Sequence, residues 1–354
     1  MASKSAVGLD IGTSSVRAAQ VSVSKGVATL ERFGQVALPA GAVRDGEVVD
    51  AAAVSAALKQ LWAQTKFTTK KVVLGVANQK VVVRQVDLPW LPGDELRQSL
   101  PFQVQDYIPI PVEQAILDYH PLEELVDGTG ARMLRVLLVA ASAEMVNSLI
   151  GAATGAGLKP SAVDLTSFAL LRSLVNVDEL GMATSAEALV DIGANVTNIV
   201  VHQGGSPRFV RILLMGGGDV TEALAERAGV PLEHAESLKQ SVGMGIPQQG
   251  GEQHPAARVI ESVGGSLIEE IRGSLDYYAA QPAAARIGRI VLTGGGSRLG
   301  GFAERLSSST RLPVELGTAL ANMKMGKTGL SAEQLQYIEP LVSVPVGLAL
   351  GVNA

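Results

Sequence analysis

The sequence predicts an α/β protein with two duplicated α/β domains and a small α+β insertion in the first. Two observations carry this prediction. A strand, an Asp-x-Gly turn and a second strand occur twice, at Gly8–Val21 and at Ala188–Val201. Between the two copies, residues 81–160 change to a different order of strands and helices. A length of 354 residues fits about two domains.

The first 80 residues are predicted to form strands around one helix. The apolar run at Ala6–Ile11 is typical of a buried strand, and Val16–Val23 follows it after a turn of glycine and hydroxyl residues. Val27–Val36 and Lys71–Val76 have the same apolar character. Between these two strands, Asp50 can cap a helix, because apolar residues follow it at helical spacing.

The inserted segment is predicted from its order of strand, helix, two strands and helix. A proline ends the first strand, and the first helix carries Leu96, Leu100 and Val104 on one face. Ser142 can cap the second helix. We expect the three strands at Val81–Leu88, Ala115–Pro121 and Met133–Ala140, and the first helix at Asp94–Tyr107.

The second half repeats the opening pattern and then adds helices. Asp219–Ala228 is expected to be a helix because it follows three glycines, and a further helix is expected to start at Pro231–Lys239. Pro255–Tyr278 has apolar residues on one stripe at helical spacing, which indicates core packing. Arg289–Leu292 is expected to be a strand that leads through a glycine run into a helix at Leu299–Leu306.

The composition excludes several classes of protein. Hydrophobic residues make up 47% of the chain and charged residues 18%, which excludes a disordered chain. The net charge of −5, with no Lys/Arg block, argues against a nucleic-acid binder. The chain has no cysteine, which excludes disulfides, Cys-bound metals and a Cys nucleophile. The longest uncharged stretch, 192–207, contains three glycines and ends in proline, so it cannot form a transmembrane helix of about 20 apolar residues. We therefore expect a soluble protein.

The two Asp-x-Gly turns predict a phosphate and magnesium site. Glycine lets the backbone approach a phosphate, and consecutive N–H groups and hydroxyls can bind its oxygens. An aspartate at a strand end can hold Mg²⁺ through water, and an arginine on the returning strand can reach a phosphate. Each turn by itself also reads as an ordinary tight hairpin. The expected binding residues are Asp10, Gly12, Thr13, Ser14, Ser15 and Arg17 with Gly193, Asn195 and Thr197, and the metal residues are Asp10 and Asp191.

Two glycine runs could lie beside a nucleoside. The run Gly294, Gly295, Gly296 and Ser297 follows a strand and permits the close approach of a flat base or a ribose. Gly217 and Gly218 precede a helix in a similar way. Both runs are also compatible with simple tight connections between a strand and a helix.

This order of motifs resembles the actin-like ATPase superfamily, which includes actin, heat-shock 70 chaperones, sugar kinases and FtsA. The resemblance spans nearly the whole chain and implies an actin-like ATPase fold that closes over ATP and Mg²⁺. It implies that Glu236 and Lys239 face the adenosine, although a solvated helix face would read the same. It also implies a catalytic role for Asp164, where relatives carry a longer Glu or Gln that positions water.

A narrower resemblance comes from the insertion, whose position is similar to that in FtsA. Gln105–Pro111 followed by Ile116–Tyr119 resembles the signature of the PilM family of type IV pilus assembly proteins. Asp45–Asp50 and Ser274–Tyr278 resemble it too. We expect the following domains: the first from residues 1–80 and 161–184, the insertion from 81–160, the second from 185–335, and a C-terminal segment, 336–354, that returns to the first.

The resemblance to PilM implies a cytoplasmic ATP-binding adaptor of the pilus assembly complex, peripheral at the inner membrane through a protein partner. Its implied partner is a PilN-like inner-membrane protein, whose cytoplasmic N-terminal tail would lie in a groove between the first domain and the insertion. Other pilus assembly proteins and self-association are further implied partners, and any ATP hydrolysis is expected to be slow.

Two other functions fit the same fold. One is an FtsA-like or MreB-like filament protein. FtsA relatives end in a basic amphipathic membrane helix, whereas no basic residue follows Lys327 here, which argues against direct membrane anchoring. The other is a small-molecule kinase, for which the sequence has no convincing acceptor motif.

Overall fold

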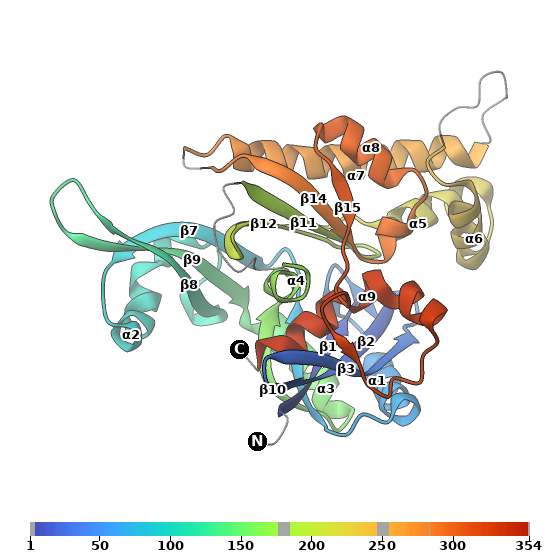
Figure 1. Ribbon diagram of the computed structural model, residues 1–354, viewed down its shortest axis with the longest axis horizontal. Coiled ribbons are helices and arrows are strands. Elements are labelled where there is room, and N and C mark those ends of the chain that lie inside the picture. The colour runs from blue at the N-terminus through green and yellow to red at the C-terminus, as the bar shows by residue number, and fades with distance from the viewer. Residues whose placement is uncertain (1–3, 176–184, 246–254, 283, 353–354) are drawn as a thin grey trace.

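The computed structural model describes residues 4–175, 185–245, 255–282 and 284–352. Two bodies, each built on a sheet, lie one above the other, and a smaller third body projects to one side (Figure 1). The lower body contains the N-terminal strands and the C-terminal helix, and the upper body contains the elements between residues 186 and 316. The mixed α/β fold predicted from the sequence is confirmed.

The lower body is built on a six-stranded sheet with the order β10-β6-β1-β2-β3-β16. β1, β2 and β3 form an antiparallel meander, whereas β6 and β10 run parallel to β1. The strands are β1 (Lys4–Ile11), β2 (Ser15–Ser24), β3 (Val27–Ala37), β6 (Lys71–Val76), β10 (Lys159–Leu165) and β16 (Lys324–Met325), and a small hairpin of β4 (Val43–Arg44) and β5 (Glu47–Val48) lies beside them.

Helices cover both faces of this sheet. α1 (Ala51–Thr65) and α3 (Ala143–Gly155) pack together on one face in a shared apolar core. The predicted cap of α1 is confirmed, because the Asp50 carboxylate accepts a hydrogen bond from the Ala53 N–H at 2.9 Å. α9 (Ala332–Gly351) packs against the other face.

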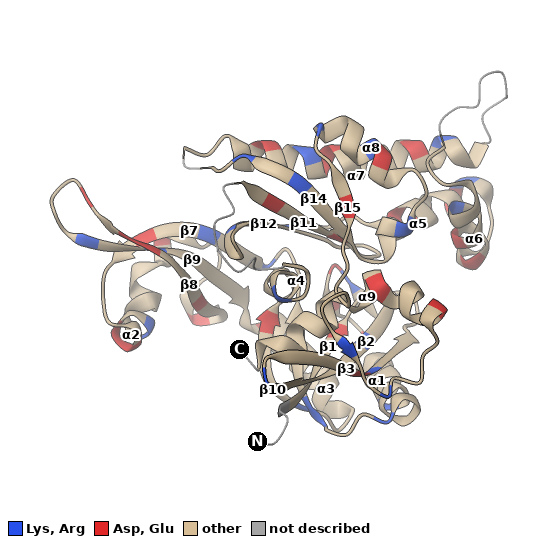
Figure 2. Cartoon of the chain, in the orientation of Figure 1, with Lys and Arg blue, Asp and Glu red and all other residues tan. Residues whose placement is uncertain are grey.

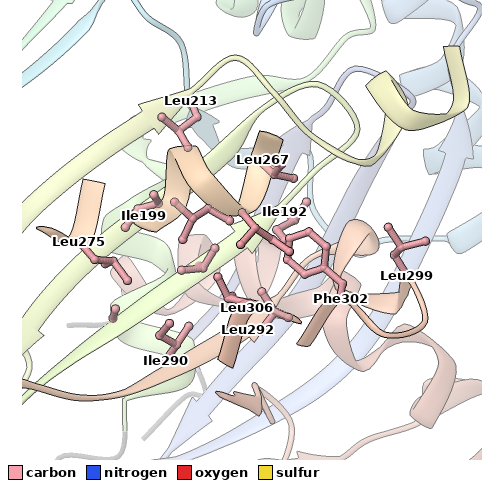
Figure 3. Packing of buried hydrophobic residues seen from close by; sticks show 14 of the residues in the cluster. Ile192, Ile199, Leu213, Leu267, Leu275, Ile290, Leu292, Leu299, Phe302 and Leu306 are labelled. Carbon is pink, nitrogen blue, oxygen red and sulfur yellow. The ribbon is translucent and has the colours of Figure 1, made fainter. Parts of the chain in front are cut away.

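The upper body is built on a five-stranded sheet with the order β13-β12-β11-β14-β15. Figure 3 shows the core between this sheet and its helices, where Phe302, Leu292 and Ile290 pack together with Leu267 and Leu275. The strands are β11 (Ala186–Ile192), β12 (Thr197–Gln203), β13 (Ser206–Leu213), β14 (Ile287–Thr293) and β15 (Val314–Leu316). The helices are α5 (Gly217–Ala228), α6 (Leu232–Val242), α7 (Pro255–Ala279), the 3-10 turn η3 (Gly295–Arg298) and α8 (Phe302–Thr310).

The third body is the insertion. Its sheet has the order β7-β9-β8 and packs against α2 around a small core of its own. The elements are β7 (Val81–Pro89), α2 (Gly93–Gln103), the 3-10 turns η1 (Gln105–Tyr107) and η2 (Val112–Gln114), β8 (Ala115–Val126) and β9 (Arg132–Ser142).

Two of the predicted domain limits need correction. The insertion was expected to end at residue 160, but α3 belongs to the core of the lower sheet and β10 pairs with β6, so the separate sheet ends at Ser142. The return to the lower body was expected at 336, but β16 already pairs with β3 at Lys324. Part of the expected segment 161–184, residues 176–184, lies outside the described residues.

Two helices connect the bodies. α4 (Thr166–Leu174) and α9 cross so closely that a methyl group on Gly347 would overlap the carbonyl oxygen of Ala169. From the upper body, the Gly294 N–H donates to the Pro340 carbonyl of α9 at 3.0 Å. Any movement of one body relative to the other would therefore have to change these contacts. Across the described ranges, no helix has the length and apolar character needed to span a membrane.

Candidate functional site

The two Asp-x-Gly turns have the same backbone geometry. In the first, between β1 and β2, the Gly12 N–H donates to the Ser15 carbonyl at 3.0 Å. In the second, between β11 and β12, the Gly193 N–H donates to the Val196 carbonyl at 2.9 Å. The repeat seen in the sequence is therefore a repeat of the hairpin itself.

The pairing of the strands aligns the polar side chains in the same way. Asp10 lies directly opposite Arg17, and Asp191 lies directly opposite Asn198. Residues directly opposite in an antiparallel pair place their side chains on the same face of the sheet. Each hairpin therefore presents one aspartate beside one partner, a cation in the first copy and an amide in the second.

Both hairpins line one cavity, with the lower body on one side and the upper body on the other. The lower body also contributes residues from the ends of β6 and from the start of α4. The lining consists of Asp10, Ile11, Gly12, Thr13, Ser14, Arg17, Gly46, Gly75, Ala77, Leu149, Thr166, Asp191, Gly193, Ala194, Val196 and Asn198.

Of the two aspartates in the cavity, Asp191 is buried and Asp10 is partly buried, and their charges repel each other. Burial, followed by the neighbouring charge of Asp10, raises the pKa of Asp191 to about 6. The charge of Arg17 and a hydrogen bond from Asn198 Nδ2 at 3.2 Å oppose this shift. Burial also raises the pKa of Asp10, against the charge of Arg17, whose Nη1 lies 3.6 Å from the Asp10 carboxylate.

The residues present fit a phosphate group with a divalent cation. Asn198 is 3% exposed, and its Oδ1 has no hydrogen-bond partner among the described residues. No cluster of three or more His, Cys, Asp or Glu side chains placed for a metal occurs in the part of the chain described. Two carboxylates would therefore hold Mg²⁺ with water and phosphate oxygens, which is how Mg²⁺ is commonly bound beside nucleotides.

The glycine runs pack around the second hairpin. The N–H groups of Gly217 and Gly218 donate to the carbonyls of Gly193 and Ala194 at 2.9 and 2.6 Å. A methyl group on Gly217 would lie 3.3 Å from the Cα of Gly296, so the two runs touch. The structure thus brings both runs to the second hairpin, as the predicted nucleoside site requires.

Lys239 is buried in this assembly, whereas Glu236 pairs with it and keeps a partly exposed side chain. Lys239 is 8% exposed, and its Nζ donates to the Gly217 carbonyl at 2.9 Å, to Thr221 at 2.8 Å and to Glu236 at 2.6 Å. Thr221 donates to the same carboxylate at 2.5 Å. The network fixes the Gly217 turn relative to α6.

Three predicted hydroxyl ligands shape the loops. Ser15 accepts a hydrogen bond from Gln35 at 3.2 Å, and the hydroxyls of Thr197 and Ser297 donate to backbone carbonyls at 2.7 and 2.6 Å. Asn195 forms a hydrogen bond to the carboxylate of Asp219 at the start of α5. Their side chains therefore hold the hairpins in shape, whereas Thr13 and Ser14 line the cavity.

The structure does not bring Asp164 to the cavity, so its predicted catalytic position needs correction. Its carboxylate pairs with Arg172 and accepts the Leu165 N–H at 2.8 Å. Thr166, two residues later, lines the cavity instead. The reason is that β10 ends between them and α4 begins at Thr166, which changes the direction of the side chains.

Sequence reasoning missed three polar residues. Asn198 had a usable signal, since it follows Asp191 by the same seven residues that separate Arg17 from Asp10. Thr166 and Thr221 had none, because a single threonine at the start of a helix or within it is common.

The chain is similar to known proteins along nearly its whole length. A family model described as type IV pilus assembly protein PilM matches residues 8–352. A solved structure described as a PilM-PilN type IV pilus biogenesis complex aligns with a TM-score of 0.85 and 29% identity, over 98% of each chain.

Other relatives share the fold. The cell division protein FtsA of Neisseria meningitidis is 27% identical over 96% of this chain and 88% of its own length. MreB5 of Spiroplasma citri, solved with AMPPNP, aligns with a TM-score of 0.58 at 12% identity, over 98% of this chain and 95% of that one, which shows the fold alone. Because the family model covers nearly the whole chain, this chain belongs to the PilM family of type IV pilus assembly proteins, on an actin-like ATPase fold.

Proposed function

We propose that this protein is an ATP-binding adaptor of the type IV pilus inner-membrane assembly complex. It binds ATP with Mg²⁺ in the cavity between its two bodies and holds the cytoplasmic N-terminal tail of a PilN-like membrane protein. It works in the cytoplasm and reaches the membrane through that partner. The observation that carries the nucleotide part is the convergence of two matching hairpins, with paired aspartates, on one cavity.

Each group in the cavity has a part in binding. The backbone N–H groups and hydroxyls of Thr13 and Ser14 bind phosphate oxygens, and Arg17 adds a charged donor. Asp10 and Asp191 would hold Mg²⁺, which neutralises phosphate charge when bound. The nucleoside would lie beside the two glycine runs, of which the one at Gly217 is fixed by Lys239.

Hydrolysis by this site is proposed to be slow. A hydrolytic site needs a group that orients the attacking water. Among the described residues that line the cavity, the only carboxylates are Asp10 and Asp191, which face the proposed metal. Asp164 is held by Arg172 away from the lining.

The partner part of the proposal is supported by the PilM-PilN complex that this chain resembles and by the charge of the insertion. Residues 81–142 contain nine acidic and four basic residues, a net charge of −5, which equals the net charge of the whole chain. Figure 2 shows acidic residues on α2 and on the insertion sheet. A negative insertion favours a tail that carries lysine or arginine.

Calorimetric titration of the nucleotide-free protein with ATP and Mg²⁺ tests the nucleotide part. The wild type should bind one nucleotide, and Asp10→Asn should bind it at least about tenfold more weakly, the effect of losing one charge-assisted interaction. Asp276→Asn on the exposed face of α7 is the matched control. A wild type that shows no binding would refute this part of the proposal.

A filament-forming protein is the second candidate, favoured by the match to FtsA over 96% of the chain. Sedimentation with ATP and Mg²⁺ separates the two candidates. An adaptor should stay in the supernatant at concentrations where it binds nucleotide, whereas a filament protein should pellet with a critical concentration.

A further inference from the structure

Arg17 is the only cationic side chain among the described residues that line the cavity. It lies opposite Asp10 on the neighbouring strand, and its charge acts on both aspartates, lowering the pKa of each against burial. One guanidinium therefore offsets the charge of two carboxylates, of which Asp191 is buried and Asp10 is partly buried.

Arg17 is held loosely. Its Nη1 is 3.6 Å from the Asp10 carboxylate, which is beyond the usual hydrogen-bond distance. Its Nε is buried with no hydrogen-bond partner among the described residues, and the same is true of Asn198 Oδ1 across the cavity. Buried polar atoms are seldom left unpaired, so both point to a ligand that completes the site.

The two hairpins differ in the residue that lies opposite the aspartate. At the position equivalent to Arg17, the second hairpin has Asn198, a neutral side chain that donates to Asp191. The cavity thus contains one cation for two carboxylates. A divalent cation that entered by itself would meet Arg17 at the same carboxylates, and like charges at short range repel.

We propose that Arg17 is an internal counter-ion for Asp10 and Asp191, and that a phosphate group must draw it away before a divalent cation can bind. This inference rests on the proposed nucleotide site and assigns it an order of assembly. In the nucleotide-free protein the guanidinium neutralises the aspartates. In the loaded protein the Arg17 guanidinium would bind a phosphate oxygen, which would leave the carboxylates of Asp10 and Asp191 free to hold Mg²⁺.

Two consequences follow for binding. The wild type should bind Mg²⁺ only together with a polyphosphate, so Mg²⁺ and ATP should each tighten the binding of the other by the same factor. Removal of the Arg17 charge should leave two uncompensated carboxylates, which then bind Mg²⁺ without any nucleotide. The conservative Arg17→Lys should behave like the wild type, because it keeps the charge.

The test is a titration of nucleotide-free protein with MgCl₂ at constant ionic strength, read by calorimetry and by the thermal midpoint. Arg17→Gln should have a lower midpoint than wild type without Mg²⁺ and should regain it with Mg²⁺, binding the ion about tenfold or more tightly than wild type. Wild type and Arg227→Gln, an exposed control on α5 with the same charge change, should show no response. Adding Asp191→Asn to Arg17→Gln should abolish the response.

The proposal is overturned if Arg17→Gln does not respond to Mg²⁺, or if wild type binds Mg²⁺ equally well with and without ATP. The second measurement needs no variant, so it decides the question if Arg17→Gln fails to fold. Binding of ATP and Mg²⁺ by wild type, measured alongside, separates the two ideas. If the wild type binds ATP with Mg²⁺ but Arg17→Gln does not respond to Mg²⁺, the proposed nucleotide site is supported and the counter-ion role of Arg17 is refuted.

Discussion

Replacing Asp191 by asparagine should stabilise the nucleotide-free protein while removing its affinity for ATP with Mg²⁺. The pKa of Asp191 is raised from 3.8 to about 6 in the folded protein, because the side chain is buried beside Asp10. The folded state therefore takes up a proton more readily than the unfolded state. The charge costs stability above pH about 6, and this cost fades as the pH falls towards 4.

The size of the effect follows from the shift of about two pKa units. Each unit corresponds to about 1.4 kcal/mol, so the ionised Asp191 costs about 3 kcal/mol at pH 8 and about half of that at pH 5. Asparagine keeps the shape without the charge. Asp191→Asn should therefore gain about 3 kcal/mol at pH 8 and about 1.5 kcal/mol at pH 5.

Urea unfolding of nucleotide-free protein at the two pH values measures this difference. Asp276→Asn, on the exposed face of α7, should change stability by less than about 0.5 kcal/mol at either pH. A loss of stability in Asp191→Asn at pH 8, or a gain that does not shrink at pH 5, would refute the claim that the ionised Asp191 side chain costs stability.

Two further substitutions test the frame around the site. Gly347→Ala should destabilise the protein by about 1–3 kcal/mol in thermal unfolding, because the new methyl group would overlap the Ala169 carbonyl. The control Gly273→Ala, on the open face of α7, should stabilise the protein by about 0.5–1 kcal/mol. Equal effects of the two substitutions would contradict the close crossing of α4 and α9. Lys239→Met should weaken ATP binding about tenfold in calorimetry, because the Gly217 carbonyl loses a hydrogen bond and Glu236 loses its cationic partner. Unchanged affinity would show that this network does not support the glycine run at Gly217 in nucleotide binding.

Much of the site could be predicted because it is duplicated. Each Asp-x-Gly turn joins two apolar strands, and the repeat of this pattern predicts that the turns face each other and bring Asp10 and Asp191 together, as they do in the cavity. Asn198 was missed although it lies at the equivalent spacing in the repeat, because its role depends on strand register, and a turn motif does not specify register beyond the turn.

The rest depended on tertiary packing. The apolar face of α3 predicts that the helix is buried, but it does not say which element covers it. In the structure that element is α1 rather than the insertion sheet. Asp164 was placed by analogy with a longer side chain, and the competing Arg172 lies on a helix that the sequence could not orient. Local patterns give elements, whereas contacts between elements decide which polar side chains point into a cavity.

The most direct test of the proposed adaptor is the binding of a labelled cytoplasmic tail peptide from the host's PilN-like protein, followed by fluorescence anisotropy with and without ATP and Mg²⁺. We expect saturable binding that a scrambled peptide does not reproduce, with an affinity that changes when the nucleotide site is filled, and the same factor should appear in the ATP affinity when the peptide is present. No saturable binding by folded, nucleotide-loaded protein would contradict the adaptor function and leave the filament as the better explanation of this fold.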